Sequence, residues 1–107
     1  MRKGLLLGAT GVFAALVIGP AAANATTVYQ GSDYAYNVGY GKVTACDGET
    51  DGHSAYSDYT ADSGNGRTKT SGGSGTCASA SMSGLRSFNA CEQIPAYPDA
   101  CSSRVYP

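Results

Sequence analysis

Residues 46–59 have the sequence Cys-Asp-Gly-Glu-Thr-Asp-Gly-His-Ser-Ala-Tyr-Ser-Asp-Tyr, and the rest of the chain is organised around them. They contain Cys46, which is the first of four cysteines, the only histidine (His53), and half of the eight acidic residues. The beginning of the stretch is polar and glycine-containing, and its end carries Tyr56 and Tyr59. This pattern predicts a loop that leads into a β-strand.

Short alternating segments on both sides of this stretch predict an all-β fold. Strands are expected over residues 34–38, 41–46, 53–60, 67–70, 76–82 and 85–91, with a last one at 104–106. Glycine-rich turn signals separate them, and no segment has a helical apolar stripe of useful length. We therefore predict a small antiparallel β-sandwich of the immunoglobulin-like type.

The first 25 residues predict a secretory signal peptide. Arg2 and Lys3 precede an apolar run over residues 5–18, and Ala23-Asn24-Ala25 is a small-residue cleavage site. The apolar run is shorter than the roughly 20 residues that a membrane span needs. We expect a secreted, extracellular chain that starts at Thr26, with a Tyr-rich segment over 26–40 and one β domain over 41–107.

The domain is expected to have a thin core that needs covalent support. Phe88 is its only phenylalanine, and the chain has no tryptophan. Four cysteines in an exported domain predict two disulfides, for which three pairings are open. We favour Cys46–Cys77 and Cys91–Cys101, each contributing about 2–4 kcal/mol to stability.

Composition excludes several partners and activities. The net charge is −1 and no basic run is present, so neither nucleic acid nor a membrane surface is an expected partner. His53 has no recognisable nucleophile motif around it, and oxidised cysteines would not bind zinc. We therefore expect a protein that is not an enzyme.

Four acids of the central stretch have the spacing of a calcium loop. Asp47, Glu49, Asp51 and Asp58 occupy its positions 1, 3, 5 and 12, with Gly52 at position 6. Glu is long for position 3, Asp is short for position 12, and no amphipathic helix flanks the loop. We favour a solvated acidic turn over a calcium site, so no metal or other cofactor is expected.

The segment 26–40 is rich in tyrosine and contains no cysteine. It is either the first strand of the domain, with half-buried tyrosines, or an extended arm that adds to a partner. Tyrosine offers a large contact area at low entropic cost. We take Tyr29, Tyr34 and Tyr36 as candidate partner-binding residues.

Several short motifs resemble a group of small secreted proteins of filamentous actinobacteria. They are Val43-x-Ala-Cys46-Asp-Gly-x-x-Asp-Gly-His-Ser-Ala-Tyr-x-x-Tyr59, Gly73-Ser-Gly-Thr-Cys77, Ser87-Phe-x-x-Cys91 and Cys101-Ser. The resemblance implies a β-sandwich-like fold and an extracellular location, and it implies no enzymatic activity.

Within this setting, the Tyr-rich segment is similar to the extended N-terminal segment of the adaptor subunit of Streptomyces umbrella toxin particles. That adaptor bridges a lectin subunit, whose trypsin-like domain receives the segment in its cleft, and a long repeat-bearing toxin subunit. The resemblance implies an adaptor in a toxin complex for competition between bacteria. Two alternatives stay open: an inhibitor of an extracellular serine protease that displays Ile94-Pro-Ala-Tyr97, and a free-standing antibacterial effector.

Overall fold

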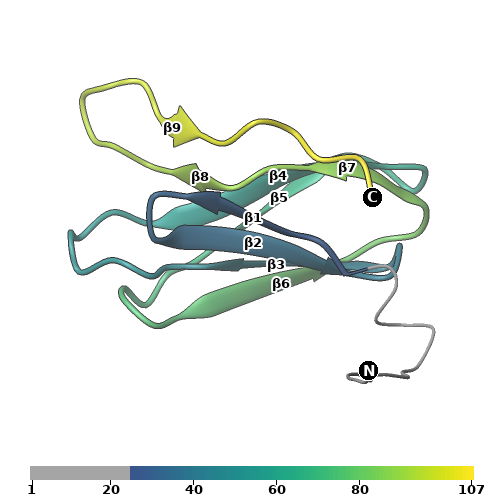
Figure 1. The fold of residues 1–107 in the computed structure, drawn as a ribbon, viewed down its shortest axis with the longest axis horizontal. Helices are drawn as coiled ribbons and strands as arrows, with labels where there is room; N and C mark the ends of the chain where they lie inside the picture. The colour runs from purple at the N-terminus through teal and green to yellow at the C-terminus, as the bar shows by residue number, and fades with distance from the viewer. Residues whose placement is uncertain (1–24) are drawn as a thin grey trace, which may run out of the picture.

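The computed structural model describes residues 25–107 as two antiparallel β-sheets packed face to face (Figure 1). Sheet A has the order β1 (Thr27–Gln30), β2 (Asp33–Val38), β3 (Lys42–Cys46) and β6 (Cys77–Ser81). Sheet B contains β5 (Gly66–Lys69), β4 (Ala55–Ala61), β7 (Leu85–Phe88), β8 (Cys91–Glu92) and β9 (Ala100–Cys101). The prediction of a small antiparallel sandwich is confirmed.

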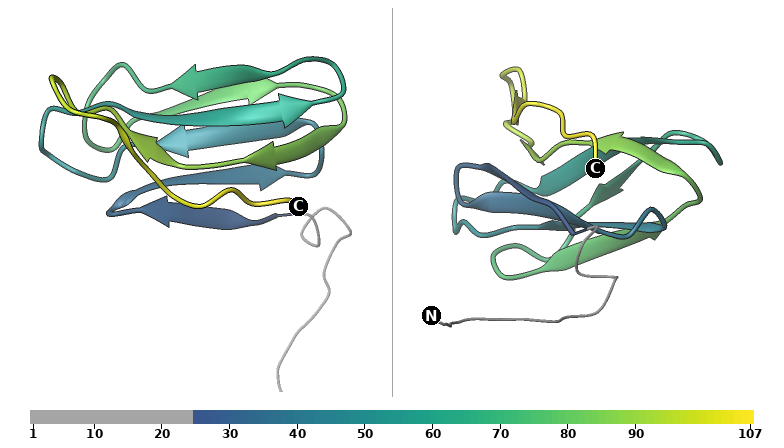
Figure 2. Two further views of the ribbon diagram at one scale, coloured as in Figure 1. Left: turned by 90° about the horizontal axis from the view of Figure 1, so that it is seen from above. Right: turned by 45° about the vertical axis from the view of Figure 1, so that its right-hand side comes forward.

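Residues 1–24 lie outside the described part of the chain, and with them nearly all of the predicted signal peptide. Over residues 25–107, no helix is long and apolar enough to cross a membrane. The strand predicted at 104–106 is reduced to one bridge between Val105 and Phe88, and β9 comes earlier, at Ala100–Cys101. The C-terminal tail runs alongside β8 and β7 (Figure 2, left).

Both predicted disulfides are present. Cys46–Cys77 joins β3 to β6, and Cys91–Cys101 joins β8 to β9, in each case between directly paired residues of one sheet. The bridges therefore staple neighbouring strands, whereas the disulfide of antibody domains crosses between the sheets. The immunoglobulin-like part of the prediction gains no support from them and stays a prediction. Two disulfides in so small a β domain fit an extracellular protein.

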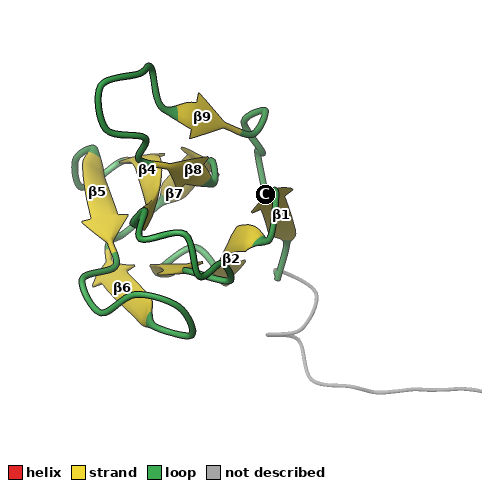
Figure 3. Cartoon of the chain, turned by 90° about the vertical axis from the view of Figure 1, so that its left-hand side faces the viewer, coloured by secondary structure: helices red, strands yellow, loops and turns green. Residues whose placement is uncertain are grey.

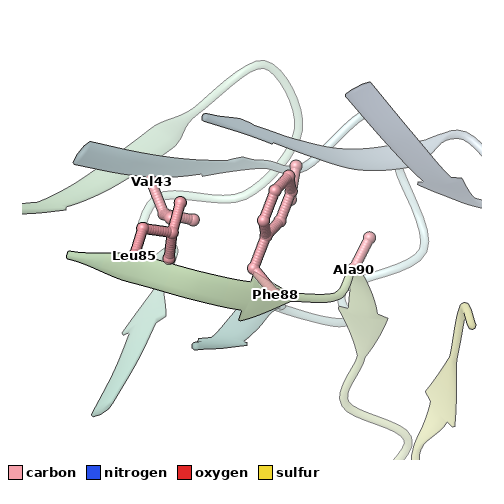
Figure 4. Packing of buried hydrophobic residues seen from close by; sticks show 5 residues of the cluster. Val43, Leu85, Phe88 and Ala90 are labelled. Carbon is pink, nitrogen blue, oxygen red and sulfur yellow. The ribbon is translucent and has the colours of Figure 1, made fainter. Parts of the chain in front are cut away.

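The core between the sheets is small, as the composition predicts. Phe88 and Leu85 of β7 pack from sheet B against Val43 and Ala35 of sheet A, with Ala90 beside them (Figure 4). Phe88 is completely buried, and burial of such a ring contributes about 1.5–3 kcal/mol. Most other core positions hold alanine or cysteine, so this ring provides much of the apolar area.

The Tyr-rich segment is part of sheet A. Its residues form the hairpin β1–β2, in which Tyr29 pairs with Tyr34 and Thr27 with Tyr36. Gly31 makes the turn between the strands with a φ of +62°, which suits glycine. Of the two interpretations of this segment, the structure has the first strand and not the free arm.

Candidate functional site

Three tyrosines gather on the outer surface of the hairpin, and we call Tyr29, Tyr34 and Tyr36 the tyrosine face. Side chains of successive strand residues point to opposite sides of a sheet. Along β2, Asp33, Ala35 and Asn37 are buried, while the two tyrosines between them are only half-buried. The small and polar side chains of β2 thus face the interior, and its aromatic side chains face outward.

The rings of the tyrosine face contact one another. The ring centroids of Tyr29 and Tyr34 are 5.6 Å apart, and those of Tyr34 and Tyr36 are 6.4 Å apart. Both distances lie in the range that favours aromatic pairs, about 4.5–7 Å. Tyr29 keeps 63% of its surface exposed. The face is therefore a continuous aromatic strip that is exposed at Tyr29 and half-buried at Tyr34 and Tyr36.

The rest of the outer surface of sheet A carries almost no charge. The strand register places the following residues on the same side as the tyrosines, with Thr44 and Cys46 buried among them: Thr27, Val38, Lys42, Thr44, Cys46, Cys77, Ser79 and Ser81. Only Lys42 among them is charged, and it lies at one end of β3. A surface of aromatic rings and hydroxyl groups suits contact with another protein better than contact with an ion.

The outer surface of sheet B is different, because its charged groups bind one another. The Arg67 guanidinium donates to both carboxylate oxygens of Asp58, at 2.6 and 3.1 Å, and lies 3.9 Å above the centre of the Tyr56 ring. Tyr56 donates to Asp99 at 2.5 Å. Burial, followed by this hydrogen bond, raises the pKa of Tyr56 to about 12. This surface offers few free groups for a partner.

The four calcium candidates do not come together. Asp47, Glu49 and Asp51 lie in the loop between β3 and β4, but Asp58 lies in the middle of β4, paired with Arg67. The helix-flanked loop implied by the spacing is therefore not formed. Strand β4, which begins at Ala55, places Asp58 away from the three acidic residues of the loop.

Two acids that the sequence analysis did not single out take the place of Asp58. Asp33, at the start of β2, and Glu92, at the end of β8, lie beside the loop. We call Asp33, Glu49, Asp51, His53 and Glu92 the acidic end. In Figure 1 the β1–β2 turn, the β3–β4 loop and the end of β8 all lie at the left of the sandwich, and Figure 3 looks onto this side.

Hydrogen bonds fix the positions of the acidic end. Glu49 accepts from the backbone N–H of Ser32 at 2.8 Å, and Asp33 Oδ1 accepts from the N–H of Gly48 at 3.0 Å. A Cβ at Gly48 would collide with the carbonyl oxygen of Ser32, so this close approach needs glycine. The loop is thus held directly against the β1–β2 turn.

The only histidine is part of the acidic end. His53 Nδ1 lies 2.7 Å from Glu92 Oε2 and 3.5 Å from Asp51 Oδ2. The contact with Glu92 is the main cause that raises the pKa of His53 above its ordinary value. His53 is thus surrounded by carboxylates, an arrangement that can hold a proton or help to position a cation.

The loop between β8 and β9 displays the segment proposed for protease inhibition. Tyr97 is 73% exposed, and its N–H donates to the carbonyl oxygen of Ile94 at 3.2 Å. Pro95 comes second in this turn, and Ala96 comes third with a φ of +66°. These are the features of a type II turn, whose third position normally requires glycine. The segment is therefore a closed turn rather than an extended strand.

No protein-family model, no curated protein and no solved structure matches this chain. The tyrosine face and the acidic end are therefore interpreted from their own geometry. The former presents a flat aromatic area, and the latter concentrates carboxylates between three segments of the chain.

Proposed function

We propose that the protein is a secreted, non-enzymatic binding module, an adaptor that joins other proteins in an extracellular complex. The observation that carries the proposal is the tyrosine face, with its contacting rings, of which Tyr29 is largely exposed, on an almost uncharged sheet surface. Exposed tyrosines of this kind are frequent hot spots of protein interfaces. The internally bonded outer surface of sheet B makes sheet A the better candidate for the contact.

The rigidity of the hairpin supports this assignment. Tyr34 pairs directly with Cys46, whose disulfide to Cys77 ties the next two strands together. Tyr36 pairs with Thr44, whose hydroxyl is hydrogen-bonded to that of Ser79 at 2.7 Å. Side chains that are already ordered lose less entropy on binding, which favours affinity.

The partner is a secreted protein that offers a flat, largely uncharged surface. In a complex like the umbrella toxin particle, the partners would be a lectin subunit with a trypsin-like fold and a repeat-bearing toxin subunit. Because the Tyr-rich segment is built into sheet A, it would engage them through its outer surface or through edge strand β1. Insertion of a free arm into a cleft is not needed.

The test is affinity capture from the culture supernatant of the producing organism with tagged wild-type protein and matched variants. Tyr29→Ala and Tyr34→Ala remove rings of the tyrosine face, while Tyr97→Ala and Tyr106→Ala remove rings elsewhere that are even more exposed. Each hot-spot ring lost should weaken binding by about 30-fold or more. The control variants should retain the partner, and thermal unfolding should show that all four variants fold.

The proposal fails if the tyrosine-face variants capture the same secreted subunits as the wild type. Capture of a single protease that the Tyr97→Ala variant loses would favour the inhibitor instead. Because residues Ile94–Tyr97 form a closed turn, that alternative has less structural support. Recovery of no partner by the wild type would favour the free-standing effector, which growth assays on neighbouring bacteria would then test.

A further inference from the structure

Carboxylates from three separate segments converge at the acidic end. One oxygen each of Asp33, Glu49 and Glu92 lies within 4.8 Å of the other two. These residues come from β2 of sheet A, the β3–β4 loop, and β8 of sheet B. Asp51 and His53 form a second group of the same compactness around Glu92. Like charges at such distances repel unless a cation or a proton lies between them.

A second, independent observation concerns Asp33. This residue is 99% buried (1% exposed), and its Oδ1 accepts the hydrogen bond from Gly48. Its Oδ2 is also buried and has no hydrogen-bond partner among the described residues. A buried carboxylate oxygen without a partner carries a large desolvation penalty.

We infer that the acidic end binds a divalent cation, Ca²⁺, through the carboxylates of Asp33, Glu49 and Glu92. Ca²⁺ takes hard oxygen ligands from carboxylates, carbonyls and water, whereas structural zinc sites use sulfur and imidazole. Asp51 supplies a further carboxylate next to Glu92. We assign His53 the role of positioning Glu92 through its Nδ1 contact, rather than that of a ligand.

This site differs from the one that the sequence spacing indicates. Asp33 and Glu92, which are distant in the sequence, are ligands here instead of Asp58, and no flanking helix is needed. Bound Ca²⁺ would cross-link β2 of sheet A to β8 of sheet B at one end of the sandwich. The inference does not depend on the tyrosine face, which lies on the outer surface of sheet A.

The test compares the purified protein after EDTA treatment with the same protein in CaCl₂, by calorimetric titration and thermal unfolding. Extracellular calcium modules bind with a Kd of about 10⁻⁴–10⁻³ M, so 10 mM CaCl₂ should raise the Tm by about 5 °C or more. Asp33→Asn and Glu92→Gln should weaken binding by at least about 10-fold. Asp62→Asn, which removes an exposed carboxylate paired with Arg86, is the matched control and should respond like the wild type.

Asp33→Asn gives a readout that mere damage to the fold cannot imitate. Without calcium, this variant should be at least as stable as the wild type, because it removes a buried charge whose Oδ2 has no hydrogen-bond partner. In calcium, only the wild type and the Asp62→Asn variant should gain stability. The inference is overturned if 10 mM CaCl₂ leaves the wild-type Tm unchanged, or shifts Asp33→Asn equally. It is also overturned if Zn²⁺ binds in preference to Ca²⁺ and His53→Ala abolishes that binding, because the imidazole would then be a ligand.

Discussion

The two disulfides should contribute unequally to stability, because they close loops of different length. Their sequence separations are 31 for Cys46–Cys77 and 10 for Cys91–Cys101. Loop-closure entropy in the unfolded chain then gives about 3.7 kcal/mol for the first bridge and about 2.7 kcal/mol for the second. Replacing both cysteines of a pair by alanine should therefore cost about 1 kcal/mol more for the long loop.

The pairs are well matched for this comparison. Each has one buried cysteine, Cys46 or Cys91, and one exposed cysteine, so the loss of packed sulfur is similar. Urea unfolding followed by circular dichroism measures both free energies of unfolding, and with a slope near 1 kcal/mol/M the midpoints should differ by about 1 M. A stabilising osmolyte such as trimethylamine N-oxide extends the measurement to a variant that is unfolded in buffer. Equal losses, or a larger loss for the short loop, would refute the reasoning.

Three further predictions concern single residues. Folding raises the pKa of Tyr56 to about 12, so the folded protein keeps the tyrosine protonated where the unfolded chain loses the proton. The contribution of Tyr56 to the free energy of unfolding should therefore be constant below the ordinary tyrosine pKa of about 10, and it should fall by about 2 kcal/mol as the pH rises from 10 to 12. Urea curves of wild type and Tyr56→Phe between pH 9 and 11 test this, since the variant should lack that part of the pH dependence. Ala96→Gly should stabilise the protein by about 0.5–1 kcal/mol, because glycine adopts the positive φ without strain; an unchanged or lower Tm would contradict the turn assignment. Phe88→Ala should cost about 3–5 kcal/mol and abolish cooperative thermal unfolding, while Tyr97→Ala, at an exposed position, should leave it intact.

The sequence predicts the class of the fold well because strand alternation and turn signals are local patterns, whereas the disulfide pairing depends on which strands become neighbours. Alternation along 41–46 and 76–82 marks two real strands, and the pairing Cys46–Cys77 follows once they are neighbours. The hairpin in the Tyr-rich segment has a local signal too, since Gly31-Ser32 is a two-residue turn between alternating segments. Treating 26–40 as one segment overlooked that turn and left the free arm open.

The acidic end is harder to predict because its residues meet only through tertiary structure. Asp33 and Glu92 belong to different sheets, and no spacing rule relates them. One sequence signal does exist: alternation places Asp33 and Asn37 on the side of β2 opposite its tyrosines. If the tyrosines lie outside, a carboxylate and an amide must lie inside, which is unusual for so thin a core. General preference puts aromatic residues inside, so the pattern alone does not decide which side is buried.

In β2, the side chains that face the interior differ in kind from those on the outer side. The side chains of β2 that face the opposite sheet are small or polar, whereas its outer side carries two half-buried tyrosines and the exposed Val38. Substitutions at 29, 34 and 36 would therefore change the chemistry of the outer surface while leaving the interior packing and both disulfides untouched. Such a hairpin can serve as a display scaffold, on which new specificities could be selected from libraries at these positions without redesigning the domain beneath.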